Sequence, residues 1–230
     1  PSGDRGRRFF SSPTPGSANL SAGSPGVVKD TNFSIDRGFY DDAFDLQIST
    51  ITIGSTIRYT LDGSVPSLSN GLTYTGPITI ATTTNVRAIP YFQSRDFIPT
   101  NVDTHTYLFL DDVETQNKTD LIAKGLAETW GYDSELRRVV PADYDMDQRV
   151  VNDTLNLREP GYSMRDALLD IPSVSLTLLQ EDFVTTRNGT SSSPRSLYGT
   201  PRERFEKNCS VEYILPDGTS GFQEDCIVET

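Results

Sequence analysis

The sequence predicts a mainly β protein, with an immunoglobulin- or fibronectin III-like β-sandwich followed by a smaller, partly irregular α+β segment. From residue 28 to about residue 110, short runs rich in Thr, Ile, Val, Tyr and Phe alternate between apolar and polar positions. Turn pairs such as Asp62-Gly63 and Asn70-Gly71 separate these runs. About seven such runs in roughly 80 residues are typical of a sandwich.

The strands of this sandwich are expected near residues 32–35, 44–49, 56–61, 72–74, 77–80, 85–91 and 104–110. Alternate residues of a strand point to the same face of its sheet. The residues expected to fill the interior are Ile57, Tyr59, Leu61, Val86, Ala88 and Ile89.

The segment before the sandwich, residues 1–27, is dominated by Ser, Pro, Gly and Ala. This composition buries too little apolar surface to offset the entropy of ordering. We therefore expect an extended segment that its own domain, a preceding domain or a neighbouring copy must hold. The start also lacks an initiating methionine and an apolar leader core, so we expect an internal piece of a larger protein.

After the sandwich, residues 111–160 are expected to form an irregular linker with an acidic loop and a helix at 118–128. In residues 161–230, Ser163 is a predicted N-cap for a helix that ends before Pro172. A strand at 174–178, a helical turn at 181–184 and a hairpin that turns at 216–218 should follow. The last residues resemble an unfinished strand.

The charge balance limits the partners. The chain carries 32 acidic and 20 basic residues, a formal net charge of −12. Binding to nucleic acid or to an anionic membrane surface needs a basic face, so both are disfavoured. No apolar run approaches the roughly 18 residues of a membrane span. The expected partners are other copies of the chain or adjacent domains of its parent protein, with polysaccharide as an alternative.

Two sequence features favour a secreted or cell-surface glycoprotein. Cys209 and Cys226 flank a predicted strand, turn and second strand, which favours a disulfide over two free buried thiols. Six of the ten asparagines stand in N-x-S/T sequons, against about two expected by chance. These candidate glycosylation sites are Asn19, Asn32, Asn117, Asn152, Asn188 and Asn208.

The sequence offers one weak metal site. Asp143, Asp145 and Asp147 form a D-x-D-x-D pattern, which begins an oxygen-rich calcium loop. Gln148 and Thr154 occupy the positions where an EF-hand loop has Gly and Glu, so a looser calcium site or a solvated acidic loop are the alternatives. Calcium is the only cofactor that we consider.

Catalytic patterns are missing from the sequence. The single histidine, His105, lies on the last predicted sandwich strand without Cys or carboxylate partners at ligand spacing, so a structural role is favoured. There is no Ser-His-Asp arrangement, no convincing Cys-His pair and no glycine-rich phosphate loop. We expect no catalytic residue, and a protein that is not an enzyme.

Several motifs of the predicted sandwich occur in the order of a known family. They are Gly38–Tyr40, Ile57–Pro66, Tyr74–Ile78 and Val86–Ala88. Over about 80 residues the chain resembles the chitobiase/β-hexosaminidase C-terminal-type domain. The resemblance implies a carbohydrate-associated module that stacks sugars on exposed rings, although the same rings could instead fill the core. The candidate rings are Tyr74, Tyr91, Phe92, Trp130 and Tyr132.

Two flanking segments resemble other families. Residues 6–19 are similar to the exit of a lamin-tail-like domain. Ile171–Ser175 and Ser210–Gly218 resemble the start of a CotH kinase-like domain, whose kinase core is not in this chain. The CotH resemblance implies the leading portion of an atypical kinase.

Three functions remain open at this point. The first is a non-catalytic structural or adhesive module, including the repeating subunit of an extracellular filament. In that case residues 7–11 would complete a neighbour's sheet and bury Phe9 and Phe10 between copies. The alternatives are a glycan-binding accessory module and the N-terminal part of a CotH-like kinase.

Overall fold

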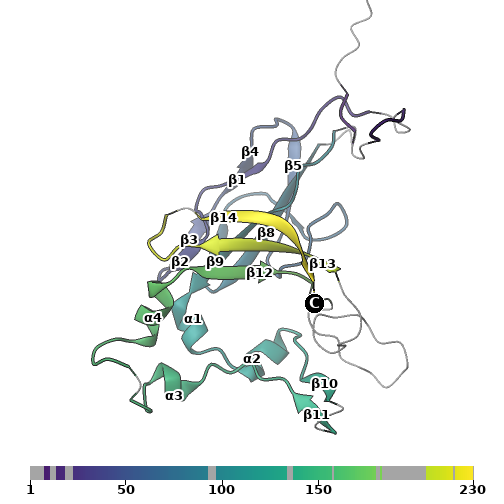
Figure 1. Ribbon diagram of the computed structural model, residues 1–230. Helices are drawn as coiled ribbons and strands as arrows, with labels where there is room; N and C mark the ends of the chain where they lie inside the picture. The colour runs from purple at the N-terminus through teal and green to yellow at the C-terminus, as the bar shows by residue number, and fades with distance from the viewer. Residues whose placement is uncertain are drawn as a thin grey trace, which may run out of the picture. The chain divides into compact units, whose positions relative to one another are not determined.

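The computed structural model describes residues 8–10, 14–18, 23–92, 97–133, 137–156, 158–179, 182, 206–219 and 221–229 (Figure 1). The chain divides into two compact units. Unit 1 comprises Pro1–Asp36, Asp45–Thr79 and Val86–Thr104, and unit 2 comprises Arg37–Phe44, Ile80–Asn85 and His105–Thr230. The predicted fold class is confirmed, because the structure is mainly β and consistent with a β-sandwich followed by a small α+β region.

The first nine strands correspond to the predicted sandwich. They are β1 (Thr31–Phe33), β2 (Gly38–Tyr40), β3 (Phe44–Leu46), β4 (Ile48–Thr50), β5 (Ser55–Thr60), β6 (Leu72–Thr73), β7 (Ile78–Ile80), β8 (Thr84–Phe92) and β9 (Asp103–Phe109). A strand was expected at every one of these places except β2.

These strands form one five-stranded sheet, in the order β2-β9-β8-β5-β6, and the two-stranded sheets β1-β4 and β3-β7. The strand β5 pairs antiparallel with both β6 and β8, whereas β2 runs parallel to β9.

The core of unit 1 consists of aliphatic side chains from several strands. Val28, Leu46, Ile48, Ile57, Val86 and Ala88 are buried. Ile89 is also buried, since β8 is covered on both faces from Val86 to Pro90. The expectation that Leu61 lies inside is wrong: its side chain is 41% exposed, because β5 ends at Thr60 and Leu61 belongs to the following turn.

An aromatic cluster organises the first part of unit 2. The ring of Tyr40, on β2, lies 4.7 Å from that of Phe44 and 5.7 Å from that of Tyr107 on β9. Phe44 also stacks on Phe109, with centroids 6.3 Å apart. Tyr107 is fully buried. Adjacent aromatic rings of this kind add stability beyond the area that they bury.

The described part of unit 2 contains four short helices: α1 (Leu110–Glu114), α2 (Lys118–Ala123), α3 (Gln148–Val151) and α4 (Met164–Asp170). The helix α2 is shorter than the predicted 118–128, because Gly125 adopts φ +97° and its N–H donates back to the Ile122 carbonyl. The helix α4 begins after Ser163, as predicted.

The start of α4 is a capping box. The Ser163 hydroxyl accepts from the backbone N–H of Asp166 at 3.1 Å, and the Asp166 carboxylate accepts from the Ser163 N–H at 2.7 Å. Arg165 then ties the helix to its surroundings in unit 2, through Asp41 at 3.0 Å and Glu114 at 3.2 Å.

The hairpin β10 (Thr129–Asp133) and β11 (Arg138–Pro141) was not expected. Its strands are short, and Gly131 interrupts the alternation by which strands are recognised in a sequence. Residues 111–160 therefore contain more regular structure than predicted. The helical turn expected at 181–184 lies outside the described residues, apart from residue 182.

A three-stranded antiparallel sheet, β12 (Ser173–Thr177), β13 (Glu206–Ile214) and β14 (Phe222–Glu229), completes unit 2 (Figure 1). The predicted hairpin is confirmed, with Tyr213 directly opposite Phe222. On the face that carries this pair, Val174 and Phe222 are exposed. On the other face, Glu212 and Ile214 are buried.

Residues before the sandwich make short pairings within unit 1. Phe9 forms a two-way backbone bridge with Ser24, and Val27 bridges to Ile98. Along the described ranges, no helix is both long and apolar enough to cross a membrane.

Candidate functional site

The candidate binding surface lies on the outer face of β5 and β8 in unit 1. Tyr91 pairs with Thr56, and Ile89 pairs with Arg58. Because cross-strand partners and alternate residues share a face, all four side chains lie on one face of the sheet. The other face carries Ile57, which is buried in the core. Tyr91 and Arg58 are therefore on the side opposite Ile57, where Ile89 is buried and Thr56 is exposed.

Arg58 holds the loop between β5 and β6 against this face. Its Nε donates to the Ser67 carbonyl at 3.1 Å and its Nη1 donates to the Thr73 hydroxyl at 2.7 Å. Its Nη2 donates to the Gly71 carbonyl. Gly71 adopts φ +85°, and a Cβ there would lie 2.4 Å from the Tyr59 carbonyl oxygen, so only glycine fits. The Arg58 guanidinium therefore positions the loop between β5 and β6.

Tyr91 is half-buried beside Arg58, while Thr56 is exposed. Burial raises the pKa of the Tyr91 phenol, and the nearby charge of Arg58 opposes that rise. The phenol is therefore neutral at physiological pH and able to donate or accept a hydrogen bond. A partly exposed ring, a neutral phenol and a threonine hydroxyl thus share one surface.

A buried polar cluster in unit 2 centres on Glu212, which the sequence analysis did not single out. Its Oε1 accepts from the Thr106 N–H at 2.9 Å and from Arg37 Nε at 2.9 Å, and its Oε2 accepts from the Thr106 hydroxyl. The side chains of Arg37 and Glu212 are 9% and 0% exposed. Burial raises the pKa of Glu212, and the Thr106 hydrogen bonds and the Arg37 charge oppose that rise.

The neighbours of this cluster are also polar. The Asn85 side-chain amide donates to Thr106 Oγ1 and Thr177 Oγ1, each at 2.8 Å, and the Thr106 and Ser175 hydroxyls lie 2.9 Å apart. Every charge and hydroxyl in this set has a partner within unit 2, so we assign the cluster to structure. It lacks an accessible group that could meet a substrate.

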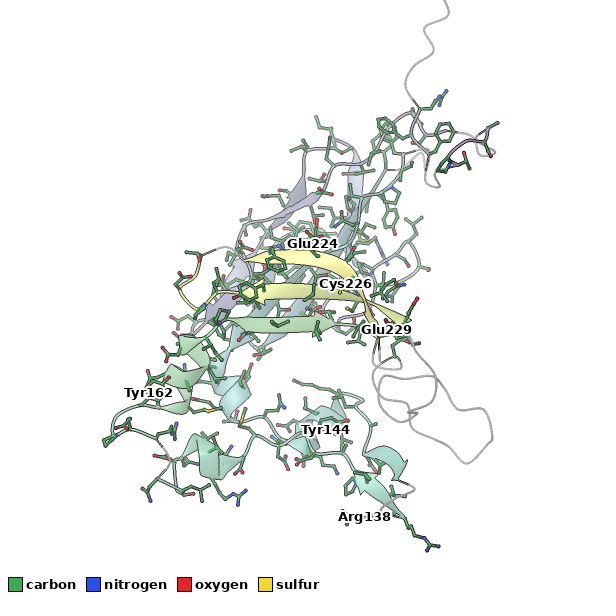
Figure 2. The ribbon with its side chains drawn as sticks, viewed as in Figure 1. Arg138, Tyr144, Tyr162, Glu224, Cys226 and Glu229 are labelled. Carbon is green, nitrogen blue, oxygen red and sulfur yellow. The ribbon has the colours of Figure 1, made fainter. Side chains whose placement is uncertain are left out.

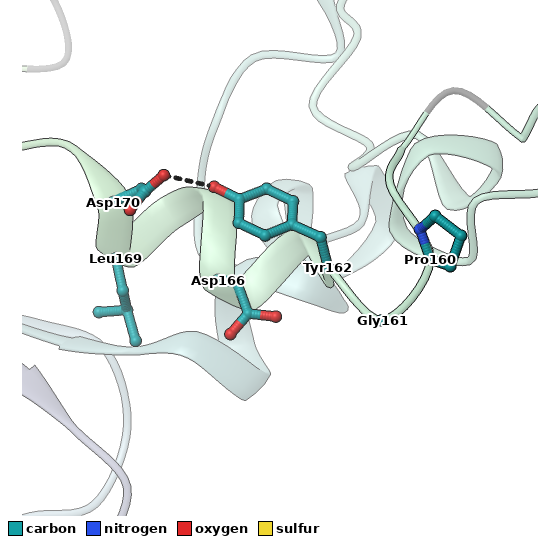
Figure 3. Close-up of a pocket in the computed structure, with 6 residues that line it drawn as sticks. All are labelled: Pro160, Gly161, Tyr162, Asp166, Leu169 and Asp170. Carbon is teal, nitrogen blue, oxygen red and sulfur yellow. Dashed lines mark hydrogen bonds between the residues drawn. The ribbon is translucent and has the colours of Figure 1, made fainter.

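A hollow beside α4 is lined by Pro160, Gly161, Tyr162, Asp166, Leu169 and Asp170 (Figure 3). The Tyr162 hydroxyl donates to Asp170 at 2.7 Å, and this bond raises the pKa of Tyr162. The Asp166 carboxylate serves the capping box, which lowers its pKa. Both carboxylates already accept hydrogen bonds from neighbouring residues. The exposed ring of Tyr162 is therefore the main group in this hollow that could contact a ligand.

The three aspartates of the proposed calcium loop make local hydrogen bonds instead of converging. Asp143 accepts from the Asp145 N–H at 3.3 Å, and Asp145 accepts from the Lys118 N–H at 2.6 Å. Asp147 caps α3 and pairs with Arg149 at 2.7 Å, which lowers the pKa of Asp147 to about 2. In the described part of the chain, no three His, Cys, Asp or Glu side chains group to hold a metal ion. The calcium site stays a prediction.

Cys209 and Cys226 are direct partners in the β13–β14 register. Figure 2 shows Cys226 on β14 between Glu224 and Glu229. Both cysteines are thiols and not a disulfide in this structure, with Cys209 buried and Cys226 half-buried. The predicted hairpin thus sets the two cysteines opposite each other, and the disulfide between them stays a prediction.

Of the six sequons, Asn32, Asn152 and Asn208 have exposed side chains. Asn117 is half-buried and is the N-cap of α2, where its Oδ1 accepts from the Asp120 N–H at 3.0 Å. Asn19 and Asn188 lie outside the described residues. Glycosylation at these positions stays a prediction.

The remaining candidate residues are placed as follows. Phe10 is half-buried with its ring against Gly23 of unit 1, and Phe9 is 44% exposed. His105 lies on β9, with its ring 6.3 Å from that of Tyr107.

The candidate rings Tyr74 and Phe92 are half-buried and in contact with Tyr59 and Phe97, respectively. The side chains of Trp130 and Tyr132, in β10, lie outside the described residues.

Comparison with known families adds one finding. Residues 35–94 match the family model of the chitobiase/beta-hexosaminidase C-terminal domain. This domain is a carbohydrate-associated accessory module, and its family is generally extracellular or secreted. The lamin-tail-like and CotH-like resemblances are not supported. No curated protein and no solved structure matches the chain. The stretch that includes Arg58 and Tyr91 is thus similar to a carbohydrate-associated domain.

Proposed function

We propose that this chain is a non-catalytic accessory module of an extracellular, carbohydrate-associated protein, and that the outer face of β5 and β8 contacts polysaccharide. One observation carries the proposal: the half-buried Tyr91 and the exposed Thr56 are cross-strand partners within the residues that match the chitobiase/beta-hexosaminidase C-terminal domain.

The chemistry of this face suits a sugar. A pyranose ring has apolar C–H groups that pack on an aromatic ring, and hydroxyls that exchange hydrogen bonds with neutral donors and acceptors. The ring of Tyr91 can supply the apolar contact, while its phenol and the Thr56 hydroxyl supply the polar ones. Arg58 acts indirectly, because its donors are used by the β5–β6 loop.

Retention on insoluble chitin and cellulose, followed by titration with soluble oligosaccharides, tests the proposal. Tyr91→Ala should weaken binding roughly 2- to 12-fold, the range expected when one aromatic contact is lost. Tyr91→Phe separates the contribution of the ring from that of the hydroxyl. Tyr162→Ala is the matched control, because it removes an exposed tyrosine ring outside residues 35–94.

Two results would contradict the assignment. The accessory role fails if the unmodified chain binds no polysaccharide on a broad glycan array. The proposed position of the binding surface is wrong, although the accessory role still holds, if Tyr91→Ala binds polysaccharide like the parent and Tyr162→Ala does not. In that case the hollow beside α4 becomes the glycan site.

A specific surface feature favours a second function, an assembly module. Val174, Leu176 and Phe222 are between 52% and 61% exposed, and the sheet register places all three on one face of β12–β14. Exposed apolar faces of this kind commonly mark protein contacts. Light scattering after size exclusion, with Leu176→Asp and Phe222→Asp variants, tests this role. A monomer at all concentrations would remove self-assembly.

A further inference from the structure

We propose that Cys209 and Cys226 are a redox modification site, in which thiol–disulfide exchange with a small-molecule disulfide forms an intrachain bond across β13 and β14. This inference is independent of the carbohydrate role. It concerns the state of the hairpin in unit 2, whereas the polysaccharide surface is on unit 1.

The geometry of the pair carries the argument. The two residues are directly opposite in an antiparallel pair, and their sulfur atoms are 3.0 Å apart. Opposite residues in such pairs have Cα atoms about 4.5–5.5 Å apart, which lies within the roughly 4.4–6.8 Å that disulfides span. The bond therefore needs no rearrangement of the strands.

The register is held independently of the sulfurs. From Glu206↔Glu229 to Tyr213↔Phe222, the two strands pair residue by residue without a bulge. The rings of Tyr213 and Phe222 stack at 5.5 Å near the turn. A Cβ on Gly221 would lie 1.6 Å from the Tyr213 carbonyl oxygen, so this glycine lets the turn close. The thiols are thus presented to each other by the fold.

The difference in exposure sets the order of the exchange. Cys226 is half-buried and Cys209 is only 5% exposed, so an incoming disulfide meets Cys226 first. The Cys226 thiolate attacks one sulfur of glutathione disulfide, and one glutathione leaves. The Cys209 thiolate then attacks Cys226 Sγ and releases the second glutathione. Two thiols lose two electrons and two protons, and one glutathione disulfide becomes two glutathione thiols.

The bond would fasten an edge strand. Of the described strands, β14 pairs only with β13, and 17 positions separate the two cysteines along the chain. Closing a loop of this length restricts the unfolded chain and raises thermal stability. For a protein of this size, we expect the oxidised form to melt roughly 6–12 °C above the reduced form.

The test equilibrates the native full chain with glutathione buffers of increasing oxidising strength, then alkylates the free thiols and measures the intact mass. We expect two alkylated thiols in the reduced protein and none in the oxidised one, with a peptide that links Cys209 to Cys226. The Cys209→Ser variant should instead retain one glutathione on Cys226, because the resolving thiol is missing.

Other outcomes would overturn the inference. One is that both thiols can still be alkylated after incubation with glutathione disulfide. Another is that a non-reducing gel shows a disulfide between separate chains. Equal amide-exchange rates of β14 in the two forms would overturn the fastening of the edge strand. If a serine variant does not fold, the comparison of oxidised and reduced native chain still decides.

Discussion

Removal of the Glu212 carboxylate should be among the most damaging changes in unit 2. The Glu212 side chain is fully buried, and it accepts hydrogen bonds from Arg37 and from the backbone and hydroxyl of Thr106. Glu212→Ala leaves the Arg37 guanidinium buried without its carboxylate. Breaking a buried pair from one side costs about 3–5 kcal/mol. We expect a loss of that size in the free energy of unfolding.

Urea denaturation followed by far-UV circular dichroism measures this loss. The matched control is Glu224→Ala, which removes an exposed glutamate from the same three-stranded sheet and should change little. The double variant that combines Arg37→Met and Glu212→Leu should be more stable than either single variant, because it leaves no unpaired charge buried. A loss below about 1 kcal/mol for Glu212→Ala would show that the Arg37–Glu212 pair contributes no more than an exposed ion pair.

The pH dependence of this group has a definite sign. Burial raises the pKa of Glu212 above its ordinary value of 4.5. Its protonated form is therefore favoured by folding, and this contribution is complete below pH 4.5 and is lost as the pH rises through the folded pKa. The stability difference between the parent and Glu212→Gln should be larger at pH 4 than at pH 7. A difference that grows toward pH 7 would contradict this.

Three further predictions concern local structure. Ser163→Ala should lower the stability of unit 2 by about 1 kcal/mol in urea denaturation, because the capping box of α4 is lost, whereas Ser163→Asp should retain most of it. Gly221→Ala should cost on the order of 2–3 kcal/mol, because the new Cβ meets the Tyr213 carbonyl; an unchanged midpoint would disprove the close approach. The Asp147 carboxyl should titrate by NMR with a pKa of about 2. Its charge and its ion pair with Arg149 therefore persist above pH 3.8 and are lost as the pH falls through 2. A titration midpoint of 3.8 would contradict the ion pair.

Local patterns in the sequence were sufficient for many elements. Alternation predicted the strands from β1 to β9 except β2, and a serine before an apolar run predicted the start of α4. The turn at 216–218 predicted the hairpin that sets Cys209 opposite Cys226. These features depend on residues near each other in the chain, and propensity, capping and turn chemistry act over that range.

The alternation of polar and apolar residues along β13 was enough to predict a strand with two distinct faces. It did not determine which face is buried. By pattern alone, Val211 and Tyr213 would be expected inside, yet Glu212 is the fully buried residue. The choice of face depends on long-range contacts, because the fold brings Arg37 and Thr106 to that carboxylate from positions 175 and 106 residues away in the chain. Burying a charge is tolerable only where such partners converge, and no local pattern records their convergence.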